Sequence, residues 1–432
     1  MVDTIFALST VPGKSGIGII RLSGPNAFLV LKQLSGSTPT LRKAVLRKLW
    51  YKEELLDESI IICSCKGKSF TGEDTVEFHL HGSQAVIRKM LSVLGTFESL
   101  RPAEAGEFTK QALYNGCLDL SQVEGLADLL NAETESQKKQ ALTLLSGTLG
   151  AKVGRWRKQI LKVLSLSEIM IDFSEEDVPK DTKEQIKENI WQILRELKSE
   201  VNGYRASQIL RTGFNVSIIG KPNTGKSSLM NYLIGSEKSI VSEIPGTTRD
   251  VIEASVDIKG TKVNFFDTAG IRASDDVVEK KGIEKALNLA KTADLRIFLL
   301  NPGDKLEDFS VKTNKNDLYF TAKSDIHRKQ CYKGISSVTG DGIDYLIDRI
   351  SYQLNNETSN ASLILNERHK IAIAKTILLL ESAKLYLKES SFDIEILVED
   401  LRMAMRALDV LIGKVDVEEV LGDIFNSFCI GK

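Results

Sequence analysis

The sequence feature that most constrains the fold is a glycine-rich octapeptide, Gly220-Lys-Pro-Asn-Thr-Gly-Lys-Ser227, which fits the pattern G-x-x-x-x-G-K-[ST]. An apolar run over 216–219 precedes it, and a helical pattern over 228–233 follows it. A strand, a glycine loop and a helix in this order wrap phosphate oxygens with backbone N–H groups at the positive end of the helix dipole. We therefore predict a phosphate-binding loop, in which Lys226 meets the β- and γ-phosphates and the Ser227 hydroxyl ligates Mg²⁺. Further predicted nucleotide contacts in this loop are Asn223, Thr224, Gly225 and Ser228.

Two downstream motifs stand in the order expected of a nucleotide-dependent switch domain. Pro245-Gly-Thr-Thr-Arg-Asp250 supplies Thr248 as a candidate switch ligand for Mg²⁺. Asp267-Thr-Ala-Gly270 follows an apolar strand, so Asp267 can hold Mg²⁺ through water and the Gly270 N–H can contact the γ-phosphate. The remaining predicted nucleotide contacts in these two segments are Ser242, Thr247, Thr268 and Ala269.

Two loops compete for recognition of a guanine base, which requires a carboxylate that accepts from N1–H and the 2-amino group. The segment 314–317 matches the pattern N-K-x-D literally. The segment Ala322-Lys-Ser-Asp325 lacks the Asn but directly follows a buried-strand pattern, where a base-reading loop belongs. We favour Lys323 and Asp325, which leaves the literal match as a solvated polar connection. The loop expected to pack on the guanine contains Ser336 and Ser337.

The residue that follows D-T-A-G cannot take part in GTP hydrolysis. Position 271 is Ile, which cannot orient the attacking water as Gln does there in many small GTPases. Asn223 stands where some GTPases hold a monovalent cation, so a K⁺ ion could supply the charge that an arginine finger supplies elsewhere. Arg249 is a competing source of that charge. We also predict that Lys226, in the phosphate loop, and Thr248, in the segment 245–250, act in catalysis.

The nucleotide-binding pattern lies inside a chain of different character. Residues 1–117 show an α+β pattern, with strands predicted over 17–23 and 74–81. Helical spacing dominates 118–210 and returns over 353–432, whereas 211–352 alternates strands with helices. We therefore predict an N-terminal α+β domain and one all-helical domain, which is interrupted by an inserted Ras-like P-loop domain with a mostly parallel sheet.

Charge balance and cysteine content limit the remaining possibilities. Lys and Arg number 57 against 58 Asp and Glu, so any RNA contact must come from a local patch or from a partner. Five scattered cysteines do not read as a disulfide framework and favour a reducing cytoplasm. The sequence has neither an apolar run of about 20 residues nor a basic-then-apolar leader, so we expect no membrane insertion.

Motifs throughout the chain match one family. They include Asp3-Thr-Ile-Phe-Ala-Leu-Ser-Thr-Val-Pro-Gly13, Thr71-Gly-Glu-Asp-Thr-Val-Glu77, Arg101-Pro-Ala-Glu-Ala-Gly-Glu-Phe-Thr109, G-T-T-R-D in the switch and Phe428-Cys-Ile-Gly-Lys432. On these residues the chain resembles the MnmE family, also called TrmE, of tRNA-modification GTPases that act on the wobble uridine. The resemblance covers essentially all 432 residues.

The resemblance implies an N-terminal domain that forms a homodimer and binds 5-formyl- or 5,10-methylene-tetrahydrofolate. Folate-site candidates carried over by motif are Arg21, Glu77 and Lys432. Cys117 stands where the family motif N-x-K-L-D-L has a lysine, and this departure removes a cation near an acidic ligand. Cys429 has two interpretations, a small buried apolar residue or a reactive thiol beside the folate.

The resemblance also implies that the GTPase domains of the dimer meet across a K⁺-dependent contact. The K⁺ candidates are Asn223, Ser242, Ile244 (through its carbonyl) and Thr247, with Ser242 in place of the usual Thr. Glu279 matches a family glutamate that helps to orient water, although by its spacing alone it is an ordinary carboxylate on a helix surface.

The function implied by the resemblance is a GTP-hydrolysing enzyme of tRNA modification. With an FAD-containing partner of the MnmG type, in a heterotetramer, it would add an aminomethyl or carboxymethylaminomethyl group at C5 of uridine 34 in certain tRNAs. The alternative is a GTP-dependent assembly switch, for example on the ribosome, without modification chemistry. The N-terminal segment and F-C-I-G-K distinguish the two, because an assembly switch has no use for a folate domain.

Overall fold

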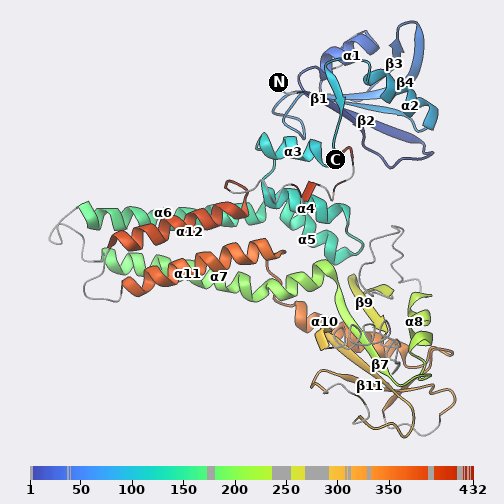
Figure 1. The fold of residues 1–432 in the computed structure, drawn as a ribbon, viewed down its shortest axis with the longest axis vertical. Coiled ribbons are helices and arrows are strands. Elements are labelled where there is room, and N and C mark those ends of the chain that lie inside the picture. The colour runs from blue at the N-terminus through green and yellow to red at the C-terminus, as the bar shows by residue number, and fades with distance from the viewer. Residues whose placement is uncertain are drawn as a thin grey trace, which may run out of the picture. The chain divides into compact units, whose positions relative to one another are not determined.

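A computed structural model describes residues 3–36, 38, 40–172, 181–235, 254–267, 291–306, 309, 313–327, 332–387, 394–415, 422, 424, 425, 428 and 430–432. The chain divides into two compact units, each assembled from separate stretches of sequence (Figure 1). The first comprises Met1–Ala127, Thr143–Asp172 and Glu395–Lys432, and the second comprises Asp128–Leu142 and Phe173–Ile394. None of the described helices has both the length and the apolar character needed to cross a bilayer.

The first unit begins with a six-stranded sheet in the order β3-β4-β5-β2-β1-β6, in which only the β1–β6 pair is parallel among the described pairings. Alternating apolar residues such as Ile20, Leu22 and Phe78 pack on two helices that cover one face. Arg21 of β2 and Glu77 of β5 lie opposite one another on the other face of the sheet. The elements are β1 (Thr4–Leu8), β2 (Ile17–Ser23), α1 (Ala27–Ser35), β3 (Val45–Tyr51), β4 (Glu54–Ser64), β5 (Thr75–His81), α2 (Gln84–Leu94), β6 (Leu100–Pro102) and α3 (Glu107–Tyr114).

The helical part of the first unit pairs segments from distant parts of the chain. Its helices are α4 (Leu120–Leu130), α6 (Thr148–Asp172) and α12 (Ile394–Leu411). The Arg157 guanidinium on α6 is 2.8 Å from the Asp409 carboxylate on α12, and Trp156 is fully buried beside it in the chain. Leu401 and Leu408 are buried on one face of α12, as their spacing predicts.

The second unit contains the inserted P-loop domain. Its six-stranded sheet has the order β12-β11-β10-β7-β9-β8, and every described pair is parallel except β8 with β9. This confirms the predicted fold class and mostly parallel sheet. The elements are β7 (Phe214–Gly220), α8 (Lys226–Ile234), β8 (Ala254–Ile258), β9 (Thr261–Asp267), β10 (Leu295–Leu300), β11 (Leu318–Ala322), β12 (Lys333–Ile335) and α10 (Ile343–Thr358).

Two long helices flank this insertion in sequence and pack on one another. They are α7 (Thr182–Thr212), which leads directly into β7, and α11 (Glu367–Tyr386), which follows α10. The Tyr204 hydroxyl on α7 donates to the Glu367 carboxylate at 3.0 Å. The predicted domain end at residue 352 falls inside α10. Ile350 and Leu354, on either side of that position, both pack into the core beneath the sheet.

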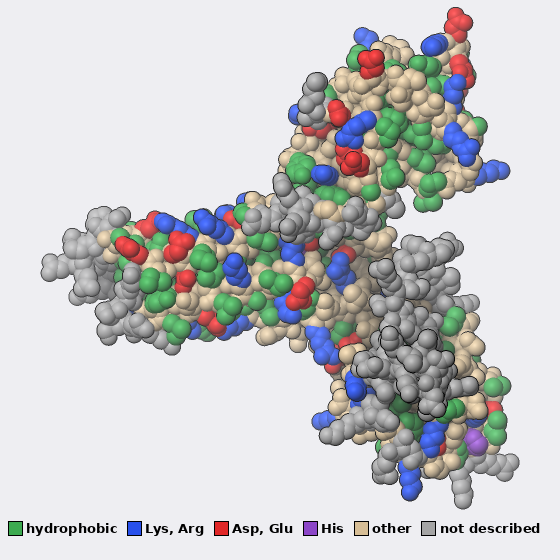
Figure 2. Space-filling model, viewed as in Figure 1, with side chains coloured by type: hydrophobic (Ala, Val, Ile, Leu, Met, Phe, Trp, Pro, Cys, Tyr) green, Lys and Arg blue, Asp and Glu red, His purple; other side chains and the backbone are tan. Residues whose placement is uncertain are grey.

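Charged side chains of both signs are interspersed over the described surface in the view of Figure 2. This mixture agrees with the nearly equal totals of basic and acidic residues. Recognition of a polyanion therefore requires a local concentration of cations.

Candidate nucleotide-binding site

The phosphate loop connects the buried strand β7 to helix α8. Gly220 must be a glycine here, because a Cβ atom would lie 2.8 Å from the Leu299 carbonyl oxygen of the neighbouring strand. Gly225 has φ +103° and Asn223 has φ +61°, so the loop turns through the left-handed region at two positions. This backbone path places the N-terminus of α8 at the carboxyl end of the parallel strands, where α/β proteins bind ligands.

The Lys226 side chain, only 5% exposed, lies inside the loop. Its ammonium donates to the carbonyl oxygens of Gly220 at 2.9 Å and Lys221 at 3.1 Å. Burial lowers the pKa of the Lys226 ammonium, and the negative charge of Asp267 opposes that shift. The loop therefore holds a cation at the position where the phosphate charge of a nucleotide is expected.

Ser227 and Asp267 meet beside this lysine, although 40 residues separate them. The Ser227 hydroxyl donates to the Asp267 carboxylate at 3.1 Å. Asp267 is the last residue of β9 and is buried, so the strand end carries it to the start of α8. A hydroxyl and a carboxylate are the hard oxygen donors that Mg²⁺ prefers, so these two residues fit the predicted metal site.

The loop after β11 carries the favoured base-reading residues. Lys323 has φ +56°, and its ammonium donates to the Asn223 carbonyl oxygen at 2.7 Å. This bond joins the loop that contains Asp325 to the phosphate loop. The Ser324 N–H donates to the Ile335 carbonyl oxygen at 3.1 Å, which connects the same loop to the end of β12, directly before Ser336.

Ser336 orders the neighbouring loop. It is fully buried, and its hydroxyl oxygen accepts the N–H groups of Val338 and Thr339, both at 3.2 Å. Its own N–H donates to the Asp341 carbonyl oxygen. Ser337 is partly exposed beside it. Residues 323–325 and 336–337 thus directly follow two adjacent strands, β11 and β12.

Asp317 corrects one expectation. Residues 313–316 are exposed, but the prediction that the whole literal N-K-x-D segment is solvated is wrong for Asp317. Its carboxylate accepts two bonds from the Arg296 guanidinium at 2.8 Å each, and the two side chains are 3% and 9% exposed. It also accepts the Asn314 N–H at 2.6 Å. The carboxylate is therefore occupied inside the domain, which leaves Asp325 as the available candidate.

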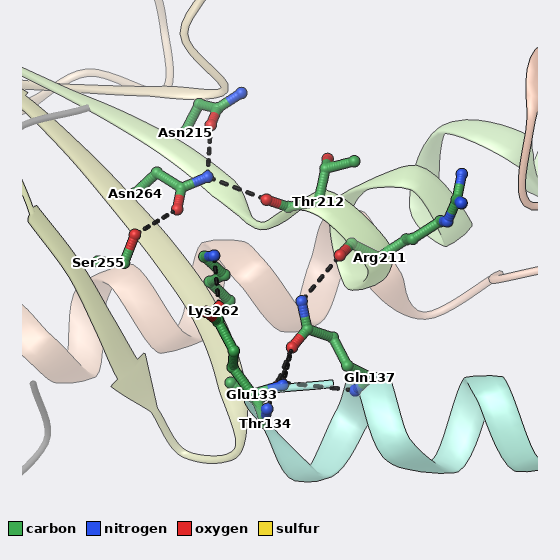
Figure 3. Close-up of polar contacts among 9 residues, drawn as sticks. All are labelled: Glu133, Thr134, Gln137, Arg211, Thr212, Asn215, Ser255, Lys262 and Asn264. Carbon is green, nitrogen blue, oxygen red and sulfur yellow. Dashed lines mark hydrogen bonds and ion pairs between the residues drawn. The ribbon is translucent and has the colours of Figure 1, made fainter. Parts of the chain in front are cut away.

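A polar network joins the β8–β9 hairpin to the segment 133–137 (Figure 3). The turn of this hairpin lies at the opposite end of β9 from Asp267. The Ser136 N–H donates to the Gly260 carbonyl oxygen at 2.9 Å, and Lys262 pairs with Glu133 at 2.5 Å. Gln137 donates to the Arg211 carbonyl oxygen at 2.8 Å, just before β7 begins. The start of α5 (Glu135–Leu145) thereby holds the strands that carry the phosphate loop and Asp267.

Several predicted site residues lie outside the described part of the chain. They are Ser242, Ile244, Thr247, Thr248, Arg249, Thr268, Ala269, Gly270, Glu279 and Cys429. Of the K⁺ candidates, Asn223 is therefore the one with a described position. The predicted nucleotide-site residues that the structure describes lie at the start of α8 or at the ends of β7, β9, β11 and β12.

A second cluster lies on the polar face of the N-terminal sheet. Arg21 on β2 and Glu77 on β5 face one another across the strands, with the guanidinium 2.8 Å from the carboxylate. The rings of Phe70 and Phe108 lie 6.0 and 5.6 Å from the Arg21 guanidinium carbon. Phe108 is fully buried and Phe70 is 42% exposed, so a planar ligand that carries a carboxylate could meet the Phe70 ring together with the Arg21 guanidinium. The two phenylalanines were not identified from the sequence, because no spacing connects them to Arg21.

The C-terminal tail packs beside this cluster. The Gly431 carbonyl oxygen accepts from the Ser9 hydroxyl at 3.0 Å and from the Arg21 guanidinium at 3.5 Å. Gly431 has φ +97°, and a Cβ atom there would lie 2.3 Å from the Leu8 carbonyl oxygen. The residue before Lys432 therefore contacts Arg21, and Lys432 itself is partly exposed.

Cys117 is exposed near the same strands. A Cβ atom on Gly72 would lie 2.9 Å from its sulfur atom, so the thiol packs against the turn at 71–72. The Thr71 hydroxyl in that turn is 2.7 Å from the hydroxyl of Ser23 on β2. The cysteine therefore lies near the strand that carries Arg21.

The fold and the phosphate loop define this chain as a P-loop GTPase, and comparison with known proteins identifies its family. A family model described as the GTP-binding protein TrmE N-terminus matches residues 4–117, and one described as the MnmE helical domain matches residues 120–429. The tRNA modification GTPase MnmE of Cereibacter sphaeroides is 45% identical over 430 residues, and that of Dinoroseobacter shibae is 44% identical over 431 residues. Both alignments cover 100% of each chain. The chain belongs to the MnmE family of tRNA modification GTPases.

Proposed function

We propose that this GTPase modifies tRNA at C5 of the wobble uridine 34. It acts with an FAD-containing partner of the MnmG type and helps to add an aminomethyl or carboxymethylaminomethyl group. The protein is a cytoplasmic homodimer that joins the partner in a heterotetramer. Hydrolysis of GTP drives a conformational change in the helical domain that accompanies the modification cycle.

The observation that carries this proposal is the presence of two sites in one chain. The P-loop domain holds Lys226, Ser227 and Asp267 together, while the N-terminal sheet holds the Arg21–Glu77 pair near the rings of Phe70 and Phe108. A nucleotide switch without modification chemistry has no need of the second site. Two curated relatives that match along their whole length are named tRNA modification GTPases, which supports the same conclusion.

Each proposed cofactor has candidate residues. Ser227, Thr248 and Asp267 serve Mg²⁺, and K⁺ is held by Asn223, Ser242, Ile244 and Thr247. Lys226, Thr248, Arg249 and Glu279 act in GTP hydrolysis. Arg21, Glu77, Cys117 and Lys432 face 5-formyl- or 5,10-methylene-tetrahydrofolate, which supplies a one-carbon unit when bound.

Nucleoside analysis of tRNA tests the function directly. Cells that lack this gene should accumulate unmodified uridine at position 34 in the affected tRNAs, and the intact gene should restore the modification. The Lys226→Ala variant should fail to restore it. An unchanged nucleoside profile in the deletion strain would instead favour the alternative, a GTP-dependent assembly switch.

We expect Asp325→Asn to change the base preference of the nucleotide site. A carboxylate accepts from both N1–H and the 2-amino group of guanine, whereas an amide keeps one acceptor oxygen for N1–H and presents its NH₂ donor to the O2 atom of xanthine. GTP affinity should fall by at least about 100-fold while XTP affinity rises: Asp325 is exposed in the structure, but a bound base would cover it, and a polar mismatch covered in this way is strongly penalised. Competitive titration with GTP and XTP measures the change.

The matched control is Asp317→Asn. Because Asp317 pairs with Arg296 inside the domain, this variant should lose stability but keep its preference for GTP. A switch to XTP in Asp317→Asn, with none in Asp325→Asn, would transfer the base-reading role to the other loop.

A further inference from the structure

A pocket of about 730 Å³ opens on the surface of α7 and α11, within the second unit and apart from the phosphate loop. Trp191, Arg195, Lys198 and Asn202 line it from α7, at spacings that place them along one face of the helix. Lys384 of α11 lines it from the other side. No carboxylate is among the lining residues that the structure describes.

The pocket exists because the segment after α10 approaches α7 closely. A Cβ atom on Gly203 would lie 2.4 Å from the Asn360 carbonyl oxygen and 2.7 Å from the Ser362 Cβ atom. The glycine therefore allows this segment to form a wall of the pocket. Asn202 and Asn360 add amide groups, which can donate to and accept from a polar ligand.

The side chains provide both an aromatic surface and positive charge. Trp191 is 52% exposed, and the Arg195 guanidinium carbon lies 5.1 Å from the centre of its ring. A planar base can stack on an exposed indole, while neighbouring cations bind the phosphate that follows it. Lys198 pairs with Glu381, but both side chains are about half exposed, so a phosphate can compete for the ammonium.

The pocket is bordered by a neighbouring pocket whose lining carries the opposite charge. A second pocket shares Trp191 and Lys384 with the first and is otherwise lined by Asp181, Glu184, Gln185, Lys187 and Glu188. These carboxylates repel phosphate, so an RNA strand is favoured only on the side of Arg195 and Lys198. Trp191 and Lys384 line both pockets and therefore lie at the border between them, whereas Arg195 and Lys198 belong to the first pocket only.

We propose that the pocket bounded by Trp191, Arg195, Lys198 and Lys384 is a docking site for tRNA, in which an unpaired base stacks on Trp191 and the adjoining phosphates contact the three cations. The chain carries a net charge of −1, so any RNA contact of its own requires a local patch of this kind. The proposal rests on the proposed function in tRNA modification and adds the place where the RNA is held.

Fluorescence of the full-length protein tests the stacking contact. The chain has three tryptophans; Trp156 is fully buried and Trp50 is 44% exposed. Titration with unmodified tRNA should quench the wild type and the Trp50→Phe variant. Trp191→Phe, which keeps an aromatic ring, should still bind tRNA but lose the quenching. Quenching that persists in Trp191→Phe would overturn the proposal.

Affinity measurements test the cations. Arg195→Ala and Lys384→Ala should each weaken tRNA binding by about 5- to 10-fold, and each should lower the slope of log affinity against log salt by about one. Lys187→Ala, on the acidic side of Trp191, is the matched control and should leave tRNA binding unchanged. GTP affinity should stay at the wild-type value in all three variants, which confirms that they are folded.

The outcomes separate this proposal from the proposed function. Wild-type tRNA affinity in the Arg195 and Lys384 variants overturns the docking site alone, provided that the deletion strain lacks the uridine modification. Normal nucleosides in the deletion strain overturn the proposed function. Quenching of Trp191 by the flavoprotein partner and not by tRNA would make the pocket a protein interface, which also contradicts the proposal.

Discussion

Lys226→Ala should lower GTP affinity by at least about 100-fold, or about 2.7 kcal/mol. The ammonium is buried in the phosphate loop and bonded to two of its carbonyl oxygens, so its removal deletes the cation closest to the phosphates. No neighbouring side chain of the described loop can take its position, because Lys221 is directed to Asp304. Titration with a fluorescent GTP analogue measures the loss.

Lys221→Ala is the matched control for this prediction. It removes a lysine of the same loop whose ammonium is 2.9 Å from the Asp304 carboxylate and whose side chain is 40% exposed. We expect GTP affinity to change by less than about 5-fold, as for a surface ion pair. If Lys226→Ala bound GTP like the wild type, the octapeptide 220–227 could not be the phosphate-binding loop.

Asp317→Ala should cause the largest loss of stability, about 3–5 kcal/mol in the P-loop domain. The substitution leaves the Arg296 guanidinium buried with both of its bonds to that carboxylate lost. It also frees the Asn314 N–H, which opens the turn before β11. The base-reading residues follow β11, so weaker GTP binding should accompany the loss of stability.

Thermal unfolding of the full chain can isolate this effect. The transition of the P-loop domain is the one that shifts to higher temperature when GTP is added, since a ligand stabilises the domain that binds it. Asp348→Ala is the control, because Asp348 forms an exposed pair with Lys259 in the same domain. It should change stability by less than about 1 kcal/mol. Equal midpoints for the Asp317 and Asp348 variants would contradict the role given to the buried pair.

The phosphate site could be predicted because its signals are local. The glycines, lysine and serine of 220–227 stand between a strand and a helix that the sequence pattern also identifies. The positions of Asp267 and Asp325 follow from strand ends, since parallel strands bring their carboxyl ends to one edge of the sheet. Physical rules that act within a few residues were therefore sufficient for this part of the fold.

The remaining features depend on contacts between distant residues. Asp317 follows a stretch of exposed residues, and its partner Arg296 lies 21 positions earlier on another strand, so the sequence pattern alone indicated solvation. The aromatic rings beside Arg21 and the attachment of 133–137 to the β8–β9 hairpin likewise join separate elements. Such pairings become visible only when the tertiary structure is known.

The contact between Ser9 and Gly431 has a consequence for protein synthesis. The two residues are 422 positions apart, and Ile430 forms a bridge with Ala105 beside them. At a translation rate of about 5–20 residues per second, Gly431 is added about 20 to 80 seconds after Ser9. The surface around Ser9 and Ala105, which binds the C-terminal tail, therefore stays uncovered until elongation is almost finished. During that time chaperones or another nascent copy can reach it.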